Sequence, residues 1–178
     1  MCVLFPELFR DGYVDYADCR IRYTTEDVPE ELVSRIHLVA VTAEEKIVVC
    51  RSEQEWRFLP GGTREPGESL YELACRELME EAGAGLEGAL RYFSAHVADS
   101  NRVRPHRPHF PHPRAYWAYA VADVRVVGVP TNPADGETVV EVLTLPADEA
   151  AEYLEAHDPI HADVLRHAAA MGLVRFMA

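Results

Sequence analysis

Residues 62–84 read GTREPGESLYELACRELMEEAGA, and this stretch decides how the rest of the chain is interpreted. Its second half carries the local signals of a helix. Ser69 and Glu72 form the S-x-x-E capping box that begins many helices, and Gly83 stands where a helix can end. The sequence therefore predicts a helix between Ser69 and Gly83, preceded by a polar loop.

Three glutamates share one edge of this helix. On a helical wheel with about 100° per residue, Glu77, Glu80 and Glu81 fall within about 100° of one another, at the i, i+3 and i+4 spacing. The neighbouring arc is mainly apolar and is predicted to be the buried face. Its members are Tyr71, Ala74, Cys75, Leu78, Met79 and Ala82. The carboxylates therefore border the core instead of facing away from it.

This glutamate edge has the chemistry of a metal site. Clustered carboxylates raise one another's pKa unless a cation lies among them, and oxygen ligands on a rigid element favour hard cations such as Mg²⁺ or Mn²⁺. Arg76 lies one turn from both Glu72 and Glu80, so we expect it to hold one carboxylate while the others stay free. The alternative is a solvated helix face that binds nothing, and the wheel alone does not separate the two.

The spacing of the whole stretch favours the metal site. It contains Gly62, five residues, Glu68, seven residues and then the run RELMEEAG of residues 76–83. This pattern resembles the box of the Nudix hydrolase family, G-x5-E-x7-R-E-U-x-E-E-x-G-U, in which U is aliphatic. Residues 56–62, WRFLPGG, are similar to the strand and turn that lead into that box. The one departure is Ala84, which is smaller than the usual final residue.

The resemblance implies an α/β protein with the Nudix fold, a mixed β-sheet sandwiched between α-helices. It also implies a metal held by the box glutamates and a backbone carbonyl, next to an ion pair that orients them. The implied metal ligands are Glu77, Glu80, Glu81 and the carbonyl of Gly62. The implied orienting pair is Arg76 with Glu68, and these two side chains join the three glutamates as the catalytic set.

The reaction implied by the resemblance is the metal-dependent hydrolysis of a nucleoside diphosphate linked to another moiety. Cations are needed because the diphosphate oxygens repel the lone pairs of water, and metal coordination lowers the pKa of a bound water so that it attacks as hydroxide. The general base is then a box glutamate or an acidic residue of a later loop, for which Asp135 and Glu137 are candidates. Two alternatives share the fold, a non-catalytic nucleotide-binding sensor and an isopentenyl diphosphate isomerase. The intact box favours the hydrolase.

Outward from the box, apolar alternation and turn residues predict further elements. Strands are predicted at residues 35–41, 46–50, 56–59, 90–97, 116–127 and 138–145, and helices at 147–156 and 159–171. We expect residues 33–178 to form the Nudix hydrolase domain and residues 1–32 to form an N-terminal arm. The arm carries Tyr13, Tyr16 and Tyr23. Because these rings need burial, we expect the arm to add a strand or to cover part of a homodimer interface.

The loop at residues 105–113, PHRPHFPHP, contains three Pro-His units. In polyproline II, with a rise of about 3.1 Å per residue, the three histidines would line one edge about 9 Å apart, too far to share one metal. The loop is then either a stiff surface segment or a segment at the mouth of the site, whose histidines and Arg107 or Arg114 meet substrate phosphate. The candidate substrate-binding residues are Arg57, Arg64, His106, His109, His112 and Arg114. Trp117 and Tyr119 share a strand face, where core packing is a simpler interpretation than base stacking.

Composition limits the partners. Seventeen Lys and Arg against thirty Asp and Glu give a net charge of −13, which disfavours binding to a nucleic acid polymer, because that binding depends on neutralising phosphates. A small nucleotide-type substrate is still allowed if metal ions supply positive charge. No apolar run approaches the roughly 20 residues of a membrane span, and the first residues lack a signal-peptide pattern. We therefore expect a cytoplasmic protein without membrane contact.

Overall fold

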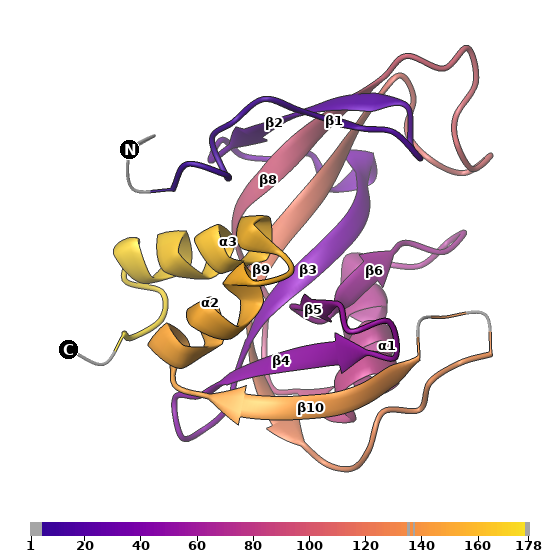
Figure 1. Ribbon diagram of the computed structural model, residues 1–178. Coiled ribbons are helices and arrows are strands. Elements are labelled where there is room, and N and C mark those ends of the chain that lie inside the picture. The colour runs from indigo at the N-terminus through magenta and orange to yellow at the C-terminus, as the bar shows by residue number, and fades with distance from the viewer. Residues whose placement is uncertain (1–4, 135, 137, 177–178) are drawn as a thin grey trace.

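A twisted sheet forms the centre of the fold (Figure 1). The computed structural model describes residues 5–134, 136 and 138–176, and within them ten strands form a sheet in the order β1-β2-β8-β9-β3-β4-β10, with β5, β6 and β7 beside β4, β3 and β9. The strands are β1 Gly12–Val14, β2 Cys19–Thr24, β3 Val33–Val41, β4 Ile47–Ser52, β5 Arg57–Phe58, β6 Gly61–Thr63, β7 Ala84–Leu86, β8 Arg91–Ser100, β9 Arg114–Val126 and β10 Val139–Leu145. The helices are α1 Leu70–Ala82, α2 Ala147–Glu155, α3 Pro159–Ala170 and the 3-10 turn η1 Glu30–Leu32.

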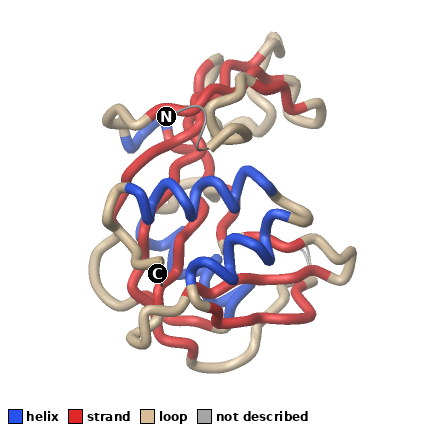
Figure 2. The backbone as a smooth tube through the Cα atoms, turned by 60° about the vertical axis from the view of Figure 1, so that its left-hand side comes forward, coloured by secondary structure: helices blue, strands red, loops and turns tan. Residues whose placement is uncertain are grey.

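Helices cover both faces of this sheet. The central pair β3 and β9 is parallel and the other described strand pairs are antiparallel, so the sheet is mixed. Alternation along β3 divides the core, because Ile36 and Leu38 pack in the cluster with α1, whereas Val39 packs in the cluster with α2 and α3. Figure 2 shows α2 and α3 together on one side of the strands. The predicted α/β class, a mixed sheet sandwiched between helices, is confirmed.

The predicted strands and helices are present, with ends that differ by at most three residues from the expected ones. The sequence pattern does not indicate β6 and β7, because strands of three residues carry almost no periodicity. In the arm, β1 pairs with β2 and β2 pairs with β8 over Cys19–Thr24. Residues 12–24 therefore add strands to the sheet edge, which is one of the two roles expected for the arm. The domain division at residue 33 stays a prediction.

Helix α1 begins and ends as its sequence predicts, but its buried face is different. Ser69 Oγ accepts the Glu72 N–H, the Glu72 carboxylate accepts the Ser69 N–H, and Gly83 takes a left-handed conformation with φ 57°. The buried residues are Leu70, Leu73, Ala74, Glu77, Leu78 and Ala82. Tyr71 and Met79, expected in the core, are exposed. The prediction was wrong because it treated Glu77 as outside the buried face. The predicted face was therefore centred away from Glu77, toward Tyr71 and Met79.

Three histidines meet between the strands and α3, where His96 and His161 are buried and His37 is half-buried. His37 on β3 stacks near Tyr119, His96 Nδ1 on β8 lies 2.8 Å from Tyr119 Oη, and the His161 ring on α3 is 4.5 Å from that of His37. Burial lowers the pKa of each histidine below its ordinary value, to about 4 for His96, although Asp158 opposes part of the shift at His161. The folded protein therefore holds these rings neutral at neutral pH.

This neutral cluster predicts that stability falls as the pH drops below about 6.5. The unfolded chain protonates its histidines near that pH, whereas the folded chain does not until the lowered pKa is reached, so the unfolded state binds more protons in between. Each buried histidine then contributes up to about 1.4 kcal/mol per pH unit. Urea unfolding at pH 7.5 and 5.5 measures the loss, which should persist when the exposed His157 is replaced by Gln. Equal stability at the two pH values would contradict the prediction.

Candidate active site

The box residues border a cavity of about 340 Å³ between β6 and α1. Strand β6 supplies backbone from one side and α1 supplies the glutamate edge from the other. The lining residues of the box are Gly62, Thr63, Glu65, Arg76, Glu77, Glu80 and Glu81, and they are joined by Arg35, Gly61, Arg107, Pro133 and Gly136. The structure therefore brings together the three glutamates, Gly62 and Arg76. We refer to this cavity as the glutamate cleft.

Arg76 is the arginine that binds the carboxylates of the glutamate cleft. Its Nε and Nη2 donate to the two carboxylate oxygens of Glu68 at 2.8 and 3.1 Å, and Nη1 donates to Glu77 Oε1 at 2.8 Å and to Glu80 Oε2 at 3.1 Å. Nη2 also donates to the Thr63 carbonyl at 3.0 Å. The expected contact of Arg76 with Glu72 is not formed, because Glu72 accepts from Ser69 in the capping box.

Glu68 and Arg76 form a pair in which each group fixes the other. Burial alone would raise the pKa of Glu68, but bonds from Arg76 and from the Glu65 N–H bring that pKa below its usual value. The pKa of Arg76 is raised further, first by its bond to Glu68. Both groups therefore stay charged at neutral pH, and Glu68 reaches the glutamate edge only through Arg76.

Glu77 lies at the bottom of the cleft against the backbone of Gly62. Its side chain is 8% exposed, and burial raises the pKa of its carboxyl, with Arg76 opposing the rise. A Cβ placed on Gly62 would lie 2.2 Å from Glu77 Oε1. Only glycine therefore lets β6 approach this carboxylate so closely.

Glu81 faces the turn that leads into β6. Its Oε2 accepts the Gly61 N–H at 2.8 Å. Gly61 has φ 154°, and a Cβ there would lie 2.2 Å from the Ile36 carbonyl. The two adjacent glycines therefore have different roles, since Gly61 allows β6 to pair with β3 and Gly62 makes room for Glu77.

The donor set of the cleft fits a hard divalent cation. It consists of carboxylate oxygens and backbone carbonyls on rigid elements, without Cys or His among the lining residues. In the described part of the chain no three such side chains already converge on one point as a metal would require. Each of the three carboxylates accepts from a protein donor, because Arg76 Nη1 binds both Glu77 and Glu80 and the Gly61 N–H binds Glu81.

The predicted substrate residues are not gathered in the glutamate cleft. Arg64 donates to the carbonyls of Glu68 and Glu30, and His109 Nε2 lies 2.9 Å from the Arg64 carbonyl. Two other arginines are engaged elsewhere: Arg57 packs on Tyr153 and Arg114 pairs with Asp99. His106 and His112 line a neighbouring pocket. Asp135 and Glu137, the reserve general bases, lie outside the described residues.

The loop at 105–113 is not the extended edge expected from its prolines. The Phe110 N–H donates to the Arg107 carbonyl at 3.0 Å, so the segment turns. His106 and His112 consequently face one cavity while His109 faces Arg64. Two arginines from outside the box, Arg35 and Arg107, line the glutamate cleft. Arg107 belongs to the loop expected to meet substrate phosphate, whereas Arg35 was not among the predicted site residues. Arg35 stands out only as a charged residue inside a strand.

Comparison with known proteins agrees with the box. The NUDIX domain family matches residues 33–168, which is most of the chain. The chain belongs to the Nudix family. Among solved structures, a mutant of the Bacillus subtilis pyrophosphohydrolase BsRppH is similar over 93% of this chain and 99% of that one, with 15% identity and a TM-score of 0.61. The E. coli ORF135 protein is similar over 82% and 97%, with 16% identity and a TM-score of 0.50.

These structural neighbours support the Nudix fold and nothing finer, because their identity to the chain is low. No curated protein matches the chain in sequence at a significant level. In the part of the chain that the structure describes, none of the helices is long and apolar enough to span a membrane.

Replacing Gly62 of the Nudix box by alanine is expected to lower kcat by about tenfold or more. The new Cβ overlaps the Glu77 carboxylate, so the side chain must leave its place, and small misplacements of catalytic groups are costly. Gly85→Ala is the matched control, because a Cβ there meets nothing within 4 Å. Steady-state kinetics of both variants check this. Equal kcat in Gly62→Ala and the wild type would show that the close approach to Glu77 has no part in turnover.

Proposed function

We propose that this Nudix protein catalyses the metal-dependent hydrolysis of a nucleoside diphosphate linked to another moiety. The observation that carries the proposal is the cleft in which Glu77, Glu80 and Glu81 line one cavity with Gly62, beside the Arg76 and Glu68 pair. Water attacks one phosphorus and its oxygen stays there, while the bond from that phosphorus to the bridging oxygen breaks. Two phosphomonoesters are released, and the two protons of the water pass to them or to solvent. One of them is a nucleoside monophosphate or the equivalent fragment.

The metal, Mg²⁺ or Mn²⁺, is assigned to Glu77, Glu80, Glu81 and the carbonyl of Gly62. When bound there, it supplies positive charge to the diphosphate oxygens and makes a water molecule more acidic. The side chains and backbone around the metal position its carboxylate ligands. Arg76 holds Glu77 and Glu80 on one side of the cleft, and the Gly61 N–H orients Glu81.

A sensor that binds nucleotide without turnover is the competing function, and one assay separates the two. The protein is incubated with Mg²⁺ and a panel of nucleoside diphosphate derivatives, and the phosphorus products are followed by chromatography. The proposal expects at least one substrate to be split into two monoesters. Binding across the panel without any product would establish the sensor.

The remaining expectations follow from this proposal. We place the reaction in the cytoplasm, on a small nucleotide and not on a nucleic acid polymer, in keeping with the net charge of −13. The homodimer stays a prediction. Light scattering of the full chain checks it, with twice the mass of 20.0 kDa expected for the pair.

A further inference from the structure

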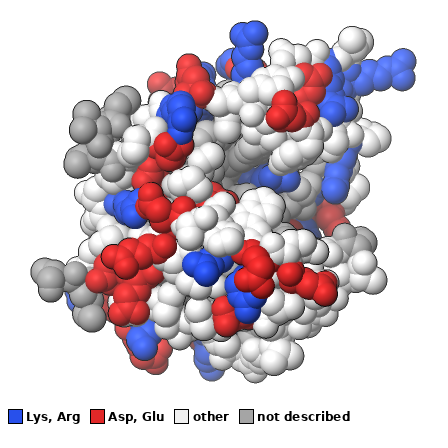
Figure 3. All heavy atoms as spheres, in the orientation of Figure 1, with Lys and Arg blue, Asp and Glu red and all other residues white. Residues whose placement is uncertain are grey.

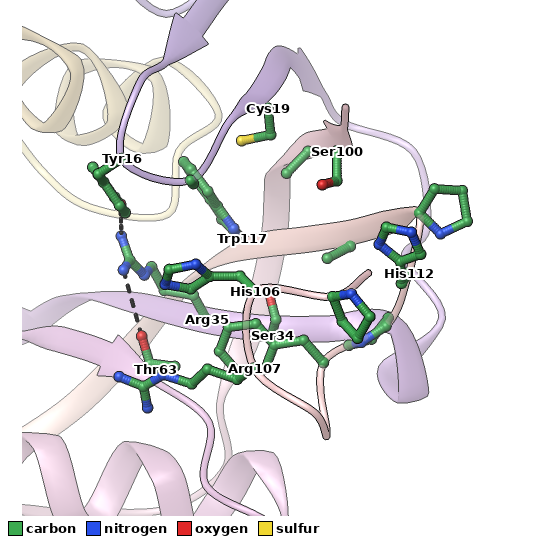
Figure 4. A pocket seen from close by; sticks show the side chains of 17 residues that line it. Tyr16, Cys19, Ser34, Arg35, Thr63, Ser100, His106, Arg107, His112 and Trp117 are labelled. Atoms are coloured by element: carbon green, nitrogen blue, oxygen red, sulfur yellow. Dashed lines mark hydrogen bonds between the residues drawn. The ribbon is translucent and has the colours of Figure 1, made fainter. Parts of the chain in front are cut away.

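A second cavity, of about 190 Å³, adjoins the glutamate cleft (Figure 4). We refer to it as the arm pocket, because the arm supplies Tyr16 to its wall, the sheet supplies Arg35 and Trp117, and the loop at 105–113 supplies His106 and Arg107. The two cavities share part of their lining. Arg35, Thr63 and Arg107 line both of them, so a ligand in the arm pocket lies next to the glutamate cleft.

The arm pocket is cationic in an acidic protein. Its lining includes two arginines and two histidines and has no Asp or Glu, although the chain carries a net charge of −13. Figure 3 shows acidic atoms spread over the molecular surface around a central hollow whose wall carries basic atoms. A concave surface that excludes carboxylates and gathers guanidinium groups attracts anions.

The two arginines are held in place without being neutralised. Arg35 Nη1 donates to Tyr16 Oη at 2.9 Å, and its guanidinium lies 5.2 Å from the Trp117 ring centre. Arg107 lies 5.6 Å from the Phe110 ring centre. Within the described residues neither arginine has a carboxylate partner, whereas Arg76 binds three of them. Aromatic and hydroxyl contacts orient these cations and leave their charge for a ligand.

The ring systems of the arm pocket suit a planar partner. Tyr16, Phe110 and Trp117 come from three separate segments and meet at one cavity, and Figure 4 shows Tyr16 and Trp117 on the side of the pocket that also holds Arg35. Aromatic walls favour a flat ring, and the arginines at the junction favour a phosphate. A nucleoside monophosphate has a planar base at one end and a phosphate at the other, which matches the aromatic wall and the arginines at the junction.

We propose that the arm pocket binds the nucleoside monophosphate half of the substrate, with its base against the aromatic wall and its phosphate between Arg35 and Arg107. This inference rests on the proposed function, because it orients a substrate whose diphosphate lies in the glutamate cleft. The phosphate is then placed at the junction, next to the scissile bond. Tyr16 lies outside the family match at 33–168, so a segment beyond the matched domain contributes to substrate recognition.

The two tryptophans allow a direct test that needs neither metal nor turnover. Trp56 is exposed and lies away from the arm pocket, so the Trp56→Phe variant leaves Trp117 as the single tryptophan. In EDTA, this variant is titrated with AMP, UMP, adenosine and ribose 5-phosphate while tryptophan fluorescence is followed. The proposal expects saturable quenching by the nucleoside monophosphates. It also expects binding about tenfold weaker for adenosine and for ribose 5-phosphate, which each lack one half of the unit.

Matched variants in the Trp56→Phe background assign the binding to its residues. Arg107→Ala is expected to weaken AMP binding about tenfold or more. Arg104→Ala, which removes the same charge from the connection between β8 and β9 but outside the pocket, is expected to leave it unchanged. Tyr16→Ala is compared in the same way with Tyr13→Ala, because Tyr13 is similarly exposed and does not line the pocket.

Three results would overturn the proposal: no change in Trp117 fluorescence at millimolar AMP, equal binding of ribose 5-phosphate and AMP, or equal losses in the paired arginine variants. The titration contains no metal, so its outcome does not depend on turnover. If nucleotides bind in the titration but the product assay shows no hydrolysis, the proposed function is wrong and the assignment of the arm pocket stands. If the product assay shows hydrolysis but Trp117 fluorescence is not quenched, the proposed function stands and the assignment of the arm pocket is wrong.

Discussion

Glu81→Gln and Glu80→Gln are each expected to lower kcat by about 10²-fold or more, with a change in melting temperature of no more than about 2 °C. Each substitution removes the charge of one oxygen ligand at the place where charge develops on the phosphate. The helix is conserved, because Gln is nearly as good a helix former as Glu. In Glu81→Gln the amide oxygen can still accept the Gly61 N–H, as the carboxylate does at 2.8 Å.

Glu152→Gln on α2 is the matched control, since it makes the same change on an exposed helix position outside the glutamate cleft. Turnover and thermal melting of all three variants are measured at saturating Mg²⁺. Wild-type kcat in both box variants would remove the glutamate edge from the mechanism.

Arg76→Ala is expected to lose about 3 kcal/mol of stability and most of the activity together. The guanidinium binds Glu68, Glu77 and Glu80, and Glu77 is a buried carboxylate whose pKa is already raised by burial. Removing one partner of a buried ion pair destabilises the fold strongly, because the other charge stays buried without a partner. The carboxylates also lose the contact that orients them, so stability and rate fall in the same variant.

Arg91→Ala provides the comparison for an exposed pair. Arg91 binds Asp123, and both side chains are about half exposed, so its loss is expected to cost less than about 1 kcal/mol. Urea unfolding measures both variants, and kinetics at a temperature where each is folded measures the rate. A loss in Arg76→Ala no larger than that in Arg91→Ala would mean that Glu77 does not depend on its guanidinium.

The local signals of the sequence were sufficient for the helix and most strands. The capping box at Ser69 and Glu72 and the left-handed Gly83 act within a few residues, so the sequence predicts α1 almost to the residue. The Nudix spacing likewise predicts which box groups lie together, because they sit on one helix and the turn before it. What the wheel could not show is that Glu77 is buried, since that depends on the close approach of Gly62 from β6.

The arm pocket was beyond sequence reasoning for a different reason. Tyr16, Arg35, Arg107 and Trp117 lie on four segments, which the sheet order β2-β8-β9-β3 brings together. Their spacing along the chain carries no motif. The prolines of the loop at 105–113 suggested an extended edge, whereas the turn between Arg107 and Phe110 directs one histidine away from the other two.

The central claim is that the glutamate cleft uses a divalent cation to split a diphosphate. The most direct measurement is ³¹P NMR of each member of the panel of nucleoside diphosphate derivatives, incubated with the metal-free wild-type protein before and after Mg²⁺ is added. For at least one member we expect unchanged diphosphate signals before the addition and their replacement by two phosphomonoester signals afterwards, with no such change in Glu81→Gln. Diphosphate signals that persist for every member of the panel in Mg²⁺ and in Mn²⁺, while the nucleotides bind, would contradict it.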